Sequence, residues 1–537
     1  MCGIVGIIGV EPVADRLLQA LKRLEYRGYD SAGIATLHDG ILDRRRAEGK
    51  LGNLEKRLKG QPLPGVTGIG HTRWATHGAP TENNAHPHST LKVSVVHNGI
   101  IENFRELREQ LLKDGYEAQT DTDSEVVAML VTCEMDKGVD PIQAVAKVLK
   151  MLNGAFGLAF LFAGHEDLII AARQGSPLAI GYGEREVYLG SDAFALAPFT
   201  NQITYLEEGD WAVLTPQATT IFDKNDQKVS RKIETSSASA AIVDKGNHRH
   251  FMAKEIFEQP ETISHALGHY LDLTTGTAPI PDDLPFDFAK LTKITIASCG
   301  SSYLAASVAK YWFERYARLP VEVDIASEFR YREPPMPEGG LALFISQSGE
   351  TADTLAALRY CAGQGQHIAS IVNVAESTIA RESDIAFPLL CGPEIGVAST
   401  KALTSQLVVL ACLAVAAGRA RNVLDAKKEQ ELVKALLHLP SAVTQALANE
   451  DNIKTVAKKL SGSSDILYLG RGPMFPVALE GALKLKELSY IHAEGYAAGE
   501  LKHGPIALVD EQMPIVVVAP SDELMEKTLS NMHEVAA

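Results

Sequence analysis

The stretch ITIASCGSS at residues 294–302 decides the fold of the second half of the chain. A continuous apolar run that ends in a Gly/Ser turn and leads into a helical pattern is typical of a strand buried on both faces of a parallel sheet. The same order of strand, turn and helix begins at residues 293–298, 341–346, 368–373 and 466–470. We therefore predict a doubly wound α/β fold here.

This pattern also repeats internally. ITIASCGSS parallels ILYLGRGP at 466–473, and LALFISQSG at 341–349 parallels PIVVVAPSD at 514–522. The first copy continues through another strand and more helix to about residue 420, whereas the second reaches Ala537 within its second helix. By this internal standard, we expect the second unit to lack its final strands.

The first half has a different pattern. Short apolar stretches predict strands at residues 3–9, 93–97, 156–162, 168–172 and 187–191, and helices are expected at 103–112 and 124–133. Strands clustered in this way indicate an α+β fold with packed sheets. A polar, Ser-rich passage at 215–247 is interpreted as the linker. The predicted domains are 2–238, a linker with a helical lead-in at 239–289, 290–430 and 450–537.

Composition excludes several classes of partner. The 537 residues allow two to four domains, and 51 basic against 67 acidic residues give a net charge of −16, which argues against nucleic-acid binding. The longest apolar run, 407–417, suits a buried helix rather than a membrane span. The six cysteines form no CxxC, so we expect reduced thiols in a cytoplasmic protein, with no metal and no cofactor.

Cys2 is an unusually placed cysteine. If Met1 is removed, this residue carries a thiol and a free α-amine whose ordinary pKa values lie close together. The amine could then accept the thiol proton, so Cys2 would be its own nucleophile–base pair. The alternative interpretation is a small buried residue.

Three further clusters could complete a site around Cys2. In HTRWATHG at 71–78, Arg73 could grip a carboxylate, or the segment could be a solvated loop with one packed Trp. Asn98 and Gly99 offer the N–H donors of an oxyanion hole, although Asn-Gly is also the commonest hairpin turn. Asp123 could hold an ammonium group, while its neighbours Thr122 and Glu125 fit a helix capping box.

The segments MCGIVGIIG, LEYRGYDSAG, GHTRWATHG, HNGIIENF and TDTDSEV together resemble the N-terminal-nucleophile (Ntn) glutamine amidotransferases. The resemblance implies that Cys2 attacks the glutamine amide and forms a thioester. It assigns the other roles as follows: the α-carboxylate to Arg73 with Thr76 and His77 beside it, the α-ammonium to Asp123, the oxyanion to Asn98 and Gly99, and the gate of an internal ammonia passage to Trp74.

A second site is predicted in the α/β half. SQSGET at 346–351 follows a strand and opens a helix, where hydroxyl groups and backbone N–H groups bind phosphate well. The loop lacks the Lys and the spacing of a nucleotide P-loop, so a monophosphate is favoured over a nucleotide. The alternative interpretation of the segment is an ordinary Ser/Thr-capped helix. The equivalent loop of the second repeat, APSDE at 519–523, is acidic and would repel phosphate. One sugar-phosphate site per chain follows.

The helix after Gly472 adds charged groups. Spacings of four and three place Glu480, Lys484 and Glu487 on one face. They could form a surface salt-bridge ladder, or Lys484 and Glu487 could be the cation and the carboxylate that an isomerisation needs. His503 lies on a Gly/Pro-bounded loop, where a histidine is usually inert, although an imidazole is suited to opening a sugar ring.

These features resemble the sugar-isomerase (SIS) domains, and ALEGALKLKELSYIHAEGY at 478–496 and GELKHGP at 499–505 resemble the glutamine–fructose-6-phosphate aminotransferase (isomerising) family, the glucosamine-6-phosphate synthases of amino-sugar biosynthesis. The resemblance implies that Glu487 moves a proton between C1 and C2, assisted by Lys484, and that His503 opens the ring in a neighbouring subunit's site, hence a homodimer. It assigns the phosphate of fructose 6-phosphate to Ser302, Ser346, Gln347, Ser348 and Thr351.

Two alternatives remain at this point. A sugar-phosphate-sensing regulator would carry a DNA-binding helix-turn-helix and no catalytic N-terminus, which is the opposite of this arrangement. The second alternative is a glutaminase that carries a sugar-phosphate-binding module but does not form the amino sugar. It arises because the family's C-terminal tail carries an imine-forming lysine that has no counterpart in this sequence. On that ground the sequence places the synthase activity of this chain in doubt.

Overall fold

The computed structural model describes the chain except for residues 1, 26–27, 29, 75–77, 237–246 and 282. The chain divides into two compact units, Met1–Val243 and Asp244–Ala537. Each unit has its own sheets and its own cores, and each is described by itself.

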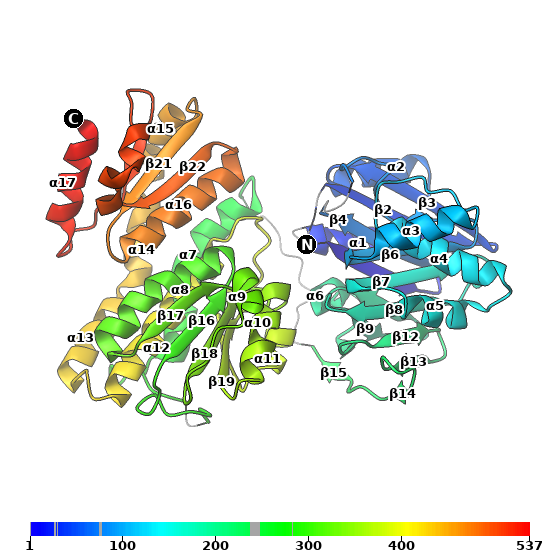
Figure 1. The fold of residues 1–537 in the computed structure, drawn as a ribbon, viewed down its shortest axis with the longest axis horizontal. Helices are drawn as coiled ribbons and strands as arrows, with labels where there is room; N and C mark the ends of the chain where they lie inside the picture. Colours follow the sequence, from blue (N-terminus) through cyan, green and yellow to red (C-terminus); the bar gives the residue numbers. More distant parts are fainter. Residues whose placement is uncertain (1, 26–27, 29, 75–77, 237–246, 282) are drawn as a thin grey trace. The chain divides into compact units, whose positions relative to one another are not determined.

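The first unit contains two antiparallel sheets (Figure 1). One sheet has the order β15-β11-β9-β10-β1-β4-β2-β3. Its strands are β1 (Gly3–Ile8), β2 (Ser31–His38), β3 (Ile41–Glu48), β4 (Thr67–Arg73), β9 (Ala179–Tyr182), β10 (Val187–Gly190), β11 (Gln202–Tyr205) and β15 (Glu234–Thr235). The other has the order β14-β13-β12-β8-β7-β6-β5. Its strands are β5 (His88–Ser89), β6 (Val93–Ile101), β7 (Gly154–Phe162), β8 (Ile169–Gln174), β12 (Trp211–Leu214), β13 (Thr219–Phe222) and β14 (Lys228–Val229).

The two sheets pack face to face. In β1, Ile4 and Ile8 join a core shared with residues of the second sheet, whereas Val5 and Ile7 join a core beneath the helices on the outer face. This alternation is the period of two that a strand requires. The first sheet is covered by α1 (Ala14–Leu24), α2 (Leu51–Gly60) and α6 (Ala193–Leu196), and the second by α3 (Phe104–Lys113), α4 (Ser124–Asp136) and α5 (Pro141–Leu149). The layers are those of an α+β Ntn sandwich.

The interpretation of 215–247 as a linker is wrong for its first part. β13 pairs with β12, β14 pairs with β13, and β15 pairs with β11, so the first unit continues to at least Thr235. These are short strands at the edges of the sheets (β14 and β15) or next to an edge (β13), and their side chains are mostly half-buried or exposed. Such strands need no apolar run, which is why a polar stretch could form them.

The second unit contains a parallel sheet in the order β17-β16-β18-β19-β20 and a smaller one in the order β22-β21-β23 (Figure 1). The strands are β16 (Ile294–Ser298), β17 (Val321–Ile325), β18 (Leu341–Ser346), β19 (His367–Val372), β20 (Ile385–Pro388), β21 (Asp465–Gly470), β22 (His492–Ala497) and β23 (Ile515–Val517). The helices are α7 (Phe251–Tyr270), α8 (Gly300–Trp312), η2 (Phe313–Ala317), α9 (Ala326–Arg332), α10 (Ala352–Ala362), α11 (Thr378–Arg381), α12 (Lys401–Ala420), α13 (Ala426–Leu437), α14 (Leu439–Leu447), α15 (Glu450–Leu460), α16 (Met474–Ser489), η3 (Ala498–His503), η4 (Pro505–Leu508) and α17 (Met525–Ala536).

The predicted internal repeat is confirmed by the strand order. β22-β21-β23 reproduces β17-β16-β18, with all pairs parallel in both sheets. In the first copy, β19 and β20 extend the sheet beyond β18, whereas in the described residues of the second copy the sheet ends at β23.

Helix α12 is a core element. Among the described residues, α12 is long and apolar enough to cross a membrane, with a mean hydropathy of 1.7 over its most apolar 18 residues. However, 78% of that stretch is buried inside the unit. Val409, Leu410 and Cys412 lie in one core with residues of β16, β18 and α8. The expectation of a buried helix at 407–417 is therefore confirmed.

Replacing Phe344 tests the packing that positions the loop after β18. Its side chain is fully buried between the sheet and α10. We expect Phe344→Ala to lower the free energy of unfolding by about 3–5 kcal/mol because it leaves a cavity. The control is Tyr331→Ala, because Tyr331 is 76% exposed. This variant should change the free energy of unfolding by less than about 0.5 kcal/mol. Urea unfolding followed by circular dichroism measures both, and equal losses would contradict the packing.

Candidate functional site

Cys2 lies where β1 and β4 run side by side. Gly3 pairs with Thr72, so Cys2 lies beside the end of β4 and the residues that follow it. The Trp74 backbone N–H donates to Cys2 Sγ at 3.2 Å, and the thiol faces the Trp74 carbonyl at 3.4 Å. A Cβ at Gly3 would come within 2.7 Å of the Leu24 side chain, so glycine is needed for this approach.

The surroundings of Cys2 favour the neutral thiol. Burial raises the pKa of the Cys2 thiol, while the hydrogen bond from Trp74 and the charge of Arg73 act in the opposite direction. A thiol with a raised pKa needs a base to become a nucleophile near neutral pH.

One small pocket collects most of the residues predicted around Cys2. It is lined by Cys2, Arg73, Trp74, His86, His97, Gly99, Thr122, Asp123 and Ser124. Arg73 is buried and donates to the carbonyls of Gly78 and Ala79, each at 3.2 Å. The structure therefore brings the predicted nucleophile, cation and carboxylate together. Thr76 and His77 lie outside the described residues.

Asn98 and Gly99 lie inside β6 and pair with Gly157 and Phe156 of β7, so the hairpin-turn alternative is wrong. The Asn98 side chain reaches the other sheet, where Nδ2 donates to the Cys2 carbonyl at 3.1 Å. Gly99 has φ of 128°, and a Cβ there would lie 2.0 Å from the Ala155 carbonyl oxygen. Glycine is required at this position.

Asp123 lies at the start of α4 and is buried. Its Oδ2 accepts a hydrogen bond from the Ile101 N–H at 2.8 Å, which fixes the carboxylate beside the pocket. The capping box is only half formed: Thr122 Oγ1 accepts from the Glu125 N–H at 3.3 Å, but the Glu125 carboxylate binds the Thr120 N–H at 2.8 Å. The carboxylate of Asp123 is therefore not used in capping α4.

The sequence did not indicate two residues that touch Asn98. Ser191 Oγ accepts from Asn98 Nδ2 at 3.0 Å and from the Ile4 N–H at 2.7 Å. His71 Nε2 lies 3.0 Å from Asn98 Oδ1. The sequence pattern predicts Ser191 only as the end of a strand, and it includes His71 only as the first residue of the HTRWATHG motif. Neither contact has a local sequence signal, because the partners are far apart in the chain.

The predicted phosphate loop lies between β18 and α10. Ser346 Oγ accepts from the Gly349 N–H at 3.0 Å and lies 2.9 Å from Thr351 Oγ1. Ser348 Oγ accepts from the Glu350 N–H at 3.2 Å, and the Gln347 carbonyl accepts from the Asn373 N–H at 3.1 Å. Within the described residues, the Thr351 side chain makes no capping hydrogen bond to α10. The simple capped-helix alternative is therefore not supported.

Ser302 lies in the first turn of α8, after the adjacent strand β16, so both loops are at the same edge of the sheet. Gln406 Nε2, from the buried face of α12, donates to Ser302 Oγ at 3.0 Å. The neighbouring Ser301 donates to Glu480 at 2.8 Å and joins α8 to α16.

The charged face predicted on α16 is confirmed. Lys484 Nζ lies 2.6 Å from Glu487 and 3.6 Å from Glu480. Burial raises the pKa of the Glu480 carboxyl, and Lys484 acts against it. The Lys484 side chain is only 19% exposed, so this group is more enclosed than a surface ladder. Within the described chain, no hydrogen bond or ion pair joins His503 to these residues.

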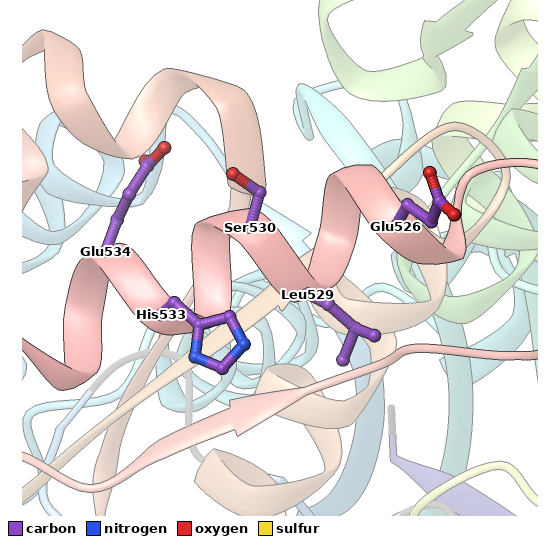
Figure 2. Close-up of a pocket in the computed structure, with 5 residues that line it drawn as sticks. All are labelled: Glu526, Leu529, Ser530, His533 and Glu534. Carbon is purple, nitrogen blue, oxygen red and sulfur yellow. The ribbon is translucent and has the colours of Figure 1, made fainter.

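Figure 2 shows a hollow on α17 lined by Glu526, Leu529, Ser530, His533 and Glu534. All five side chains come from one helix. This hollow contains none of the predicted site residues and is the flank of a helix rather than a second site.

Comparison with known families matches both units. A glutamine amidotransferase domain model matches residues 71–198, and an SIS domain model matches 287–416 and 459–537. The C-terminal domain of glucosamine-fructose-6-phosphate aminotransferase from Francisella tularensis is similar to this chain, with 46% identity and a TM-score of 0.53, over 55% of this chain and 82% of that chain. Fold and site thus define an Ntn glutamine amidotransferase joined to SIS domains.

Curated relatives extend over the whole chain. Glutamine–fructose-6-phosphate aminotransferases (isomerising) from Brucella abortus and Bradyrhizobium diazoefficiens are 65% and 63% identical to it, over 100% of this chain and 88% of each relative. The chain belongs to the glutamine–fructose-6-phosphate aminotransferase (isomerising) family.

Replacing Gly99 tests the close approach of β6 and β7. Alanine at a positive φ costs about 1–2 kcal/mol, and at position 99 its Cβ must also displace the Ala155 carbonyl. We expect Gly99→Ala to destabilise the first unit by about 3 kcal/mol or more. Gly115→Ala, at φ of 89° with open space around it, should cost only the backbone strain. Thermal unfolding compares the two, and equal shifts in Tm would contradict the geometry.

Proposed function

We propose that this chain transfers the amide nitrogen of glutamine to fructose 6-phosphate and isomerises the product, giving glucosamine 6-phosphate and glutamate. Family membership along the whole chain supports this reaction. The first step of amino-sugar biosynthesis is the proposed role of the reaction. The observation that carries the proposal is the single pocket lined by Cys2, Arg73, Gly99 and Asp123. It holds a nucleophile together with groups of both charges, as an amino-acid substrate requires.

The glutamine reaction would begin once Met1 is removed. The α-amine of Cys2 accepts the thiol proton, and Sγ attacks the side-chain amide carbon. Arg73 binds the α-carboxylate and Asp123 the α-ammonium, while Asn98 and Gly99 donate to the oxyanion. The amine returns its proton to the leaving nitrogen, and ammonia and a thioester result. Water then releases glutamate. By the family pattern, Thr76 and His77 complete the glutamine site.

The sugar reaction would use the second unit. The hydroxyl groups and N–H groups of the loop after β18, with Ser302, bind the phosphate. Glu487 moves the proton between C1 and C2, and Lys484, 2.6 Å away, stabilises the charge that develops on oxygen. His503 opens the ring. The residues assigned to the phosphate are Ser302, Ser346, Gln347, Ser348 and Thr351.

Trp74 is proposed as the gate for ammonia. Its backbone N–H donates to Cys2 Sγ, its side chain is 41% exposed, and it lines the pocket that holds Cys2, so it lies between the thiol and solvent. An internal route would keep ammonia from becoming ammonium, which lacks the nucleophilic lone pair.

A cytoplasmic location is also proposed for the protein. All six cysteines lie in the described chain and are free thiols, as is usual in a reducing compartment.

A homodimer is the proposed assembly. In the described chain, no hydrogen bond or ion pair joins His503 to Lys484 or Glu487, and the family pattern assigns this histidine to a second copy's site. Large apolar side chains are exposed on the segment that runs from the end of α16 through η4. They are Leu488, Tyr490, Ile506 and Leu508, and Tyr490 is 89% exposed. Such side chains are typical of an interface.

The two-site assignment is tested with Cys2→Ala. We expect it to lower glutamine-dependent amino-sugar formation by about 10⁴-fold or more, because the nucleophile is lost. Binding of fructose 6-phosphate, measured by calorimetry, should change less than about twofold. Cys133→Ala, a buried thiol away from the pocket, is the matched control and should remain active.

If Cys2→Ala lost fructose 6-phosphate binding as well as amino-sugar formation, the division into two sites would be contradicted. Glutamate release without amino sugar in the unmodified chain would contradict the full reaction and leave a glutaminase with a sugar-phosphate-binding module.

The assembly is tested by light scattering. We expect the chain to have twice its monomer mass in solution, and the double variant Leu488→Asp with Tyr490→Asp to have the monomer mass, because two charges would be desolvated in the interface. Leu91→Asp is the control: Leu91 is 95% exposed in the first unit, and its replacement should leave the dimer intact. A monomeric wild type, or a dimeric double variant, would refute this interface.

A further inference from the structure

The orientation of the Asn98 amide is fixed from both ends. Its Nδ2 lies 3.1 Å from the Cys2 carbonyl oxygen, which can only accept, so the NH₂ group must be on that side. Its Oδ1 lies 3.0 Å from His71 Nε2. That nitrogen is also 2.9 Å from the His97 carbonyl oxygen, another group that can only accept. His71 Nε2 therefore carries the hydrogen and donates to Asn98 Oδ1 and the His97 carbonyl together.

His71 is held in this form by its surroundings. Its side chain is fully buried, and the His86 ring stacks on it with the ring centres 4.1 Å apart. Burial lowers the pKa of His71 to about 3, so the ring is neutral and carries one hydrogen. Among the described residues, no partner meets Nδ1. The hydrogen is therefore committed to Nε2.

We propose that His71 is a positioning residue for the glutamine reaction: its Nε2–H holds Oδ1 of Asn98, so that the amide presents N–H groups, and never its oxygen, to the reacting centre at Cys2. The proposal rests on the proposed function, in which Asn98 stabilises the oxyanion. Ser191 supports the same orientation from the other end by accepting from Nδ2.

The role follows from what the amide does without His71. Oδ1 would lose its donor and become a buried, unpaired acceptor, which is costly. The amide would then be held only through Nδ2, by the Cys2 carbonyl and Ser191, and it could tilt so that its N–H groups move away from where the oxyanion develops. Losing one oxyanion donor costs about 10²–10³-fold in rate. Such a tilt, which weakens this donor without removing it, should therefore cost about 10- to 100-fold in rate. Binding of glutamine, which uses Arg73 and Asp123, should change little.

Three variants of the full chain separate this role from simple packing. His71→Phe keeps a ring against His86 and removes the hydrogen bond. His71→Gln places an N–H near the position of Nε2, whereas His71→Asn places it near Nδ1. The matched control is His88→Phe, because the His88 ring also contacts His86, at 4.6 Å, but its Nε2 lies 3.1 Å from Thr122 Oγ1 and makes no contact with Asn98.

The experiment measures glutamine hydrolysis in the wild-type and Asn98→Ala backgrounds. We expect His71→Phe to lower kcat by about 10- to 100-fold with KM within about threefold, and His71→Gln to restore most of it. In the Asn98→Ala background, His71→Phe should change kcat by less than about twofold, since its target is gone. His88→Phe should have the same effect in both backgrounds. Alkylation of Cys2 by iodoacetamide, which needs no oxyanion hole, should proceed equally in wild type and His71→Phe.

Several results would overturn the proposal. An equal loss from His71→Phe in both backgrounds would make His71 a packing residue. If His71→Phe does not fold, His71→Gln is compared with His71→Asn, because only His71→Gln keeps an N–H donor near the position of Nε2. Equal activities of these two variants would also make His71 a packing residue. Wild-type kcat in Asn98→Ala alone would remove the oxyanion role of Asn98, and with it the proposed function's assignment.

Discussion

In the proposed reaction, Cys2 is the first residue of the processed chain and is attached to the fold on one side only, so the contacts around it must supply the rest of its support. Cys2 precedes β1, and its carbonyl is held by Asn98, which reaches across from the other sheet. Ser191, after β10, binds both Asn98 and the N–H of Ile4. In the proposed reaction, the contact between the sheets at Asn98 would therefore fix the nucleophile and the oxyanion donors together, which is the preorganisation that such catalysis needs.

The second unit meets a different requirement with repeated strands and helices. Parallel strands bring their following loops to one edge, and the first copy supplies hydroxyl groups there. The second copy has an acidic loop instead, and Glu523 of that loop pairs with Arg315 beside α8, at 2.6 Å. Its contribution is α16, which Glu480 joins to Ser301. In the proposed reaction, one copy would thus bind the phosphate, and the other would supply acid–base groups from α16.

Much of this was predictable from the sequence where the signal is local. The buried strands of the second unit are continuous apolar runs, and the residues of the Cys2 pocket lie in short motifs. The edge strands at 219–235 were missed because exposed edges need no apolar pattern. Asn98-Gly99 has the sequence of a turn but lies within a strand, because the backbone of β7 approaches Gly99 too closely for any side chain. The roles of Ser191 and His71 depend on contacts between residues distant in the chain, which no local pattern encodes.

The covalent step at Cys2 is the centre of this account, and trapping the intermediate tests it most directly. The chain is quenched in acid during glutamine turnover, digested and examined by mass spectrometry. The account predicts a γ-glutamyl thioester on a peptide that begins at Cys2, with Met1 absent. Glutamate release with no adduct on Cys2, or with Met1 still attached to the labelled peptide, would contradict it.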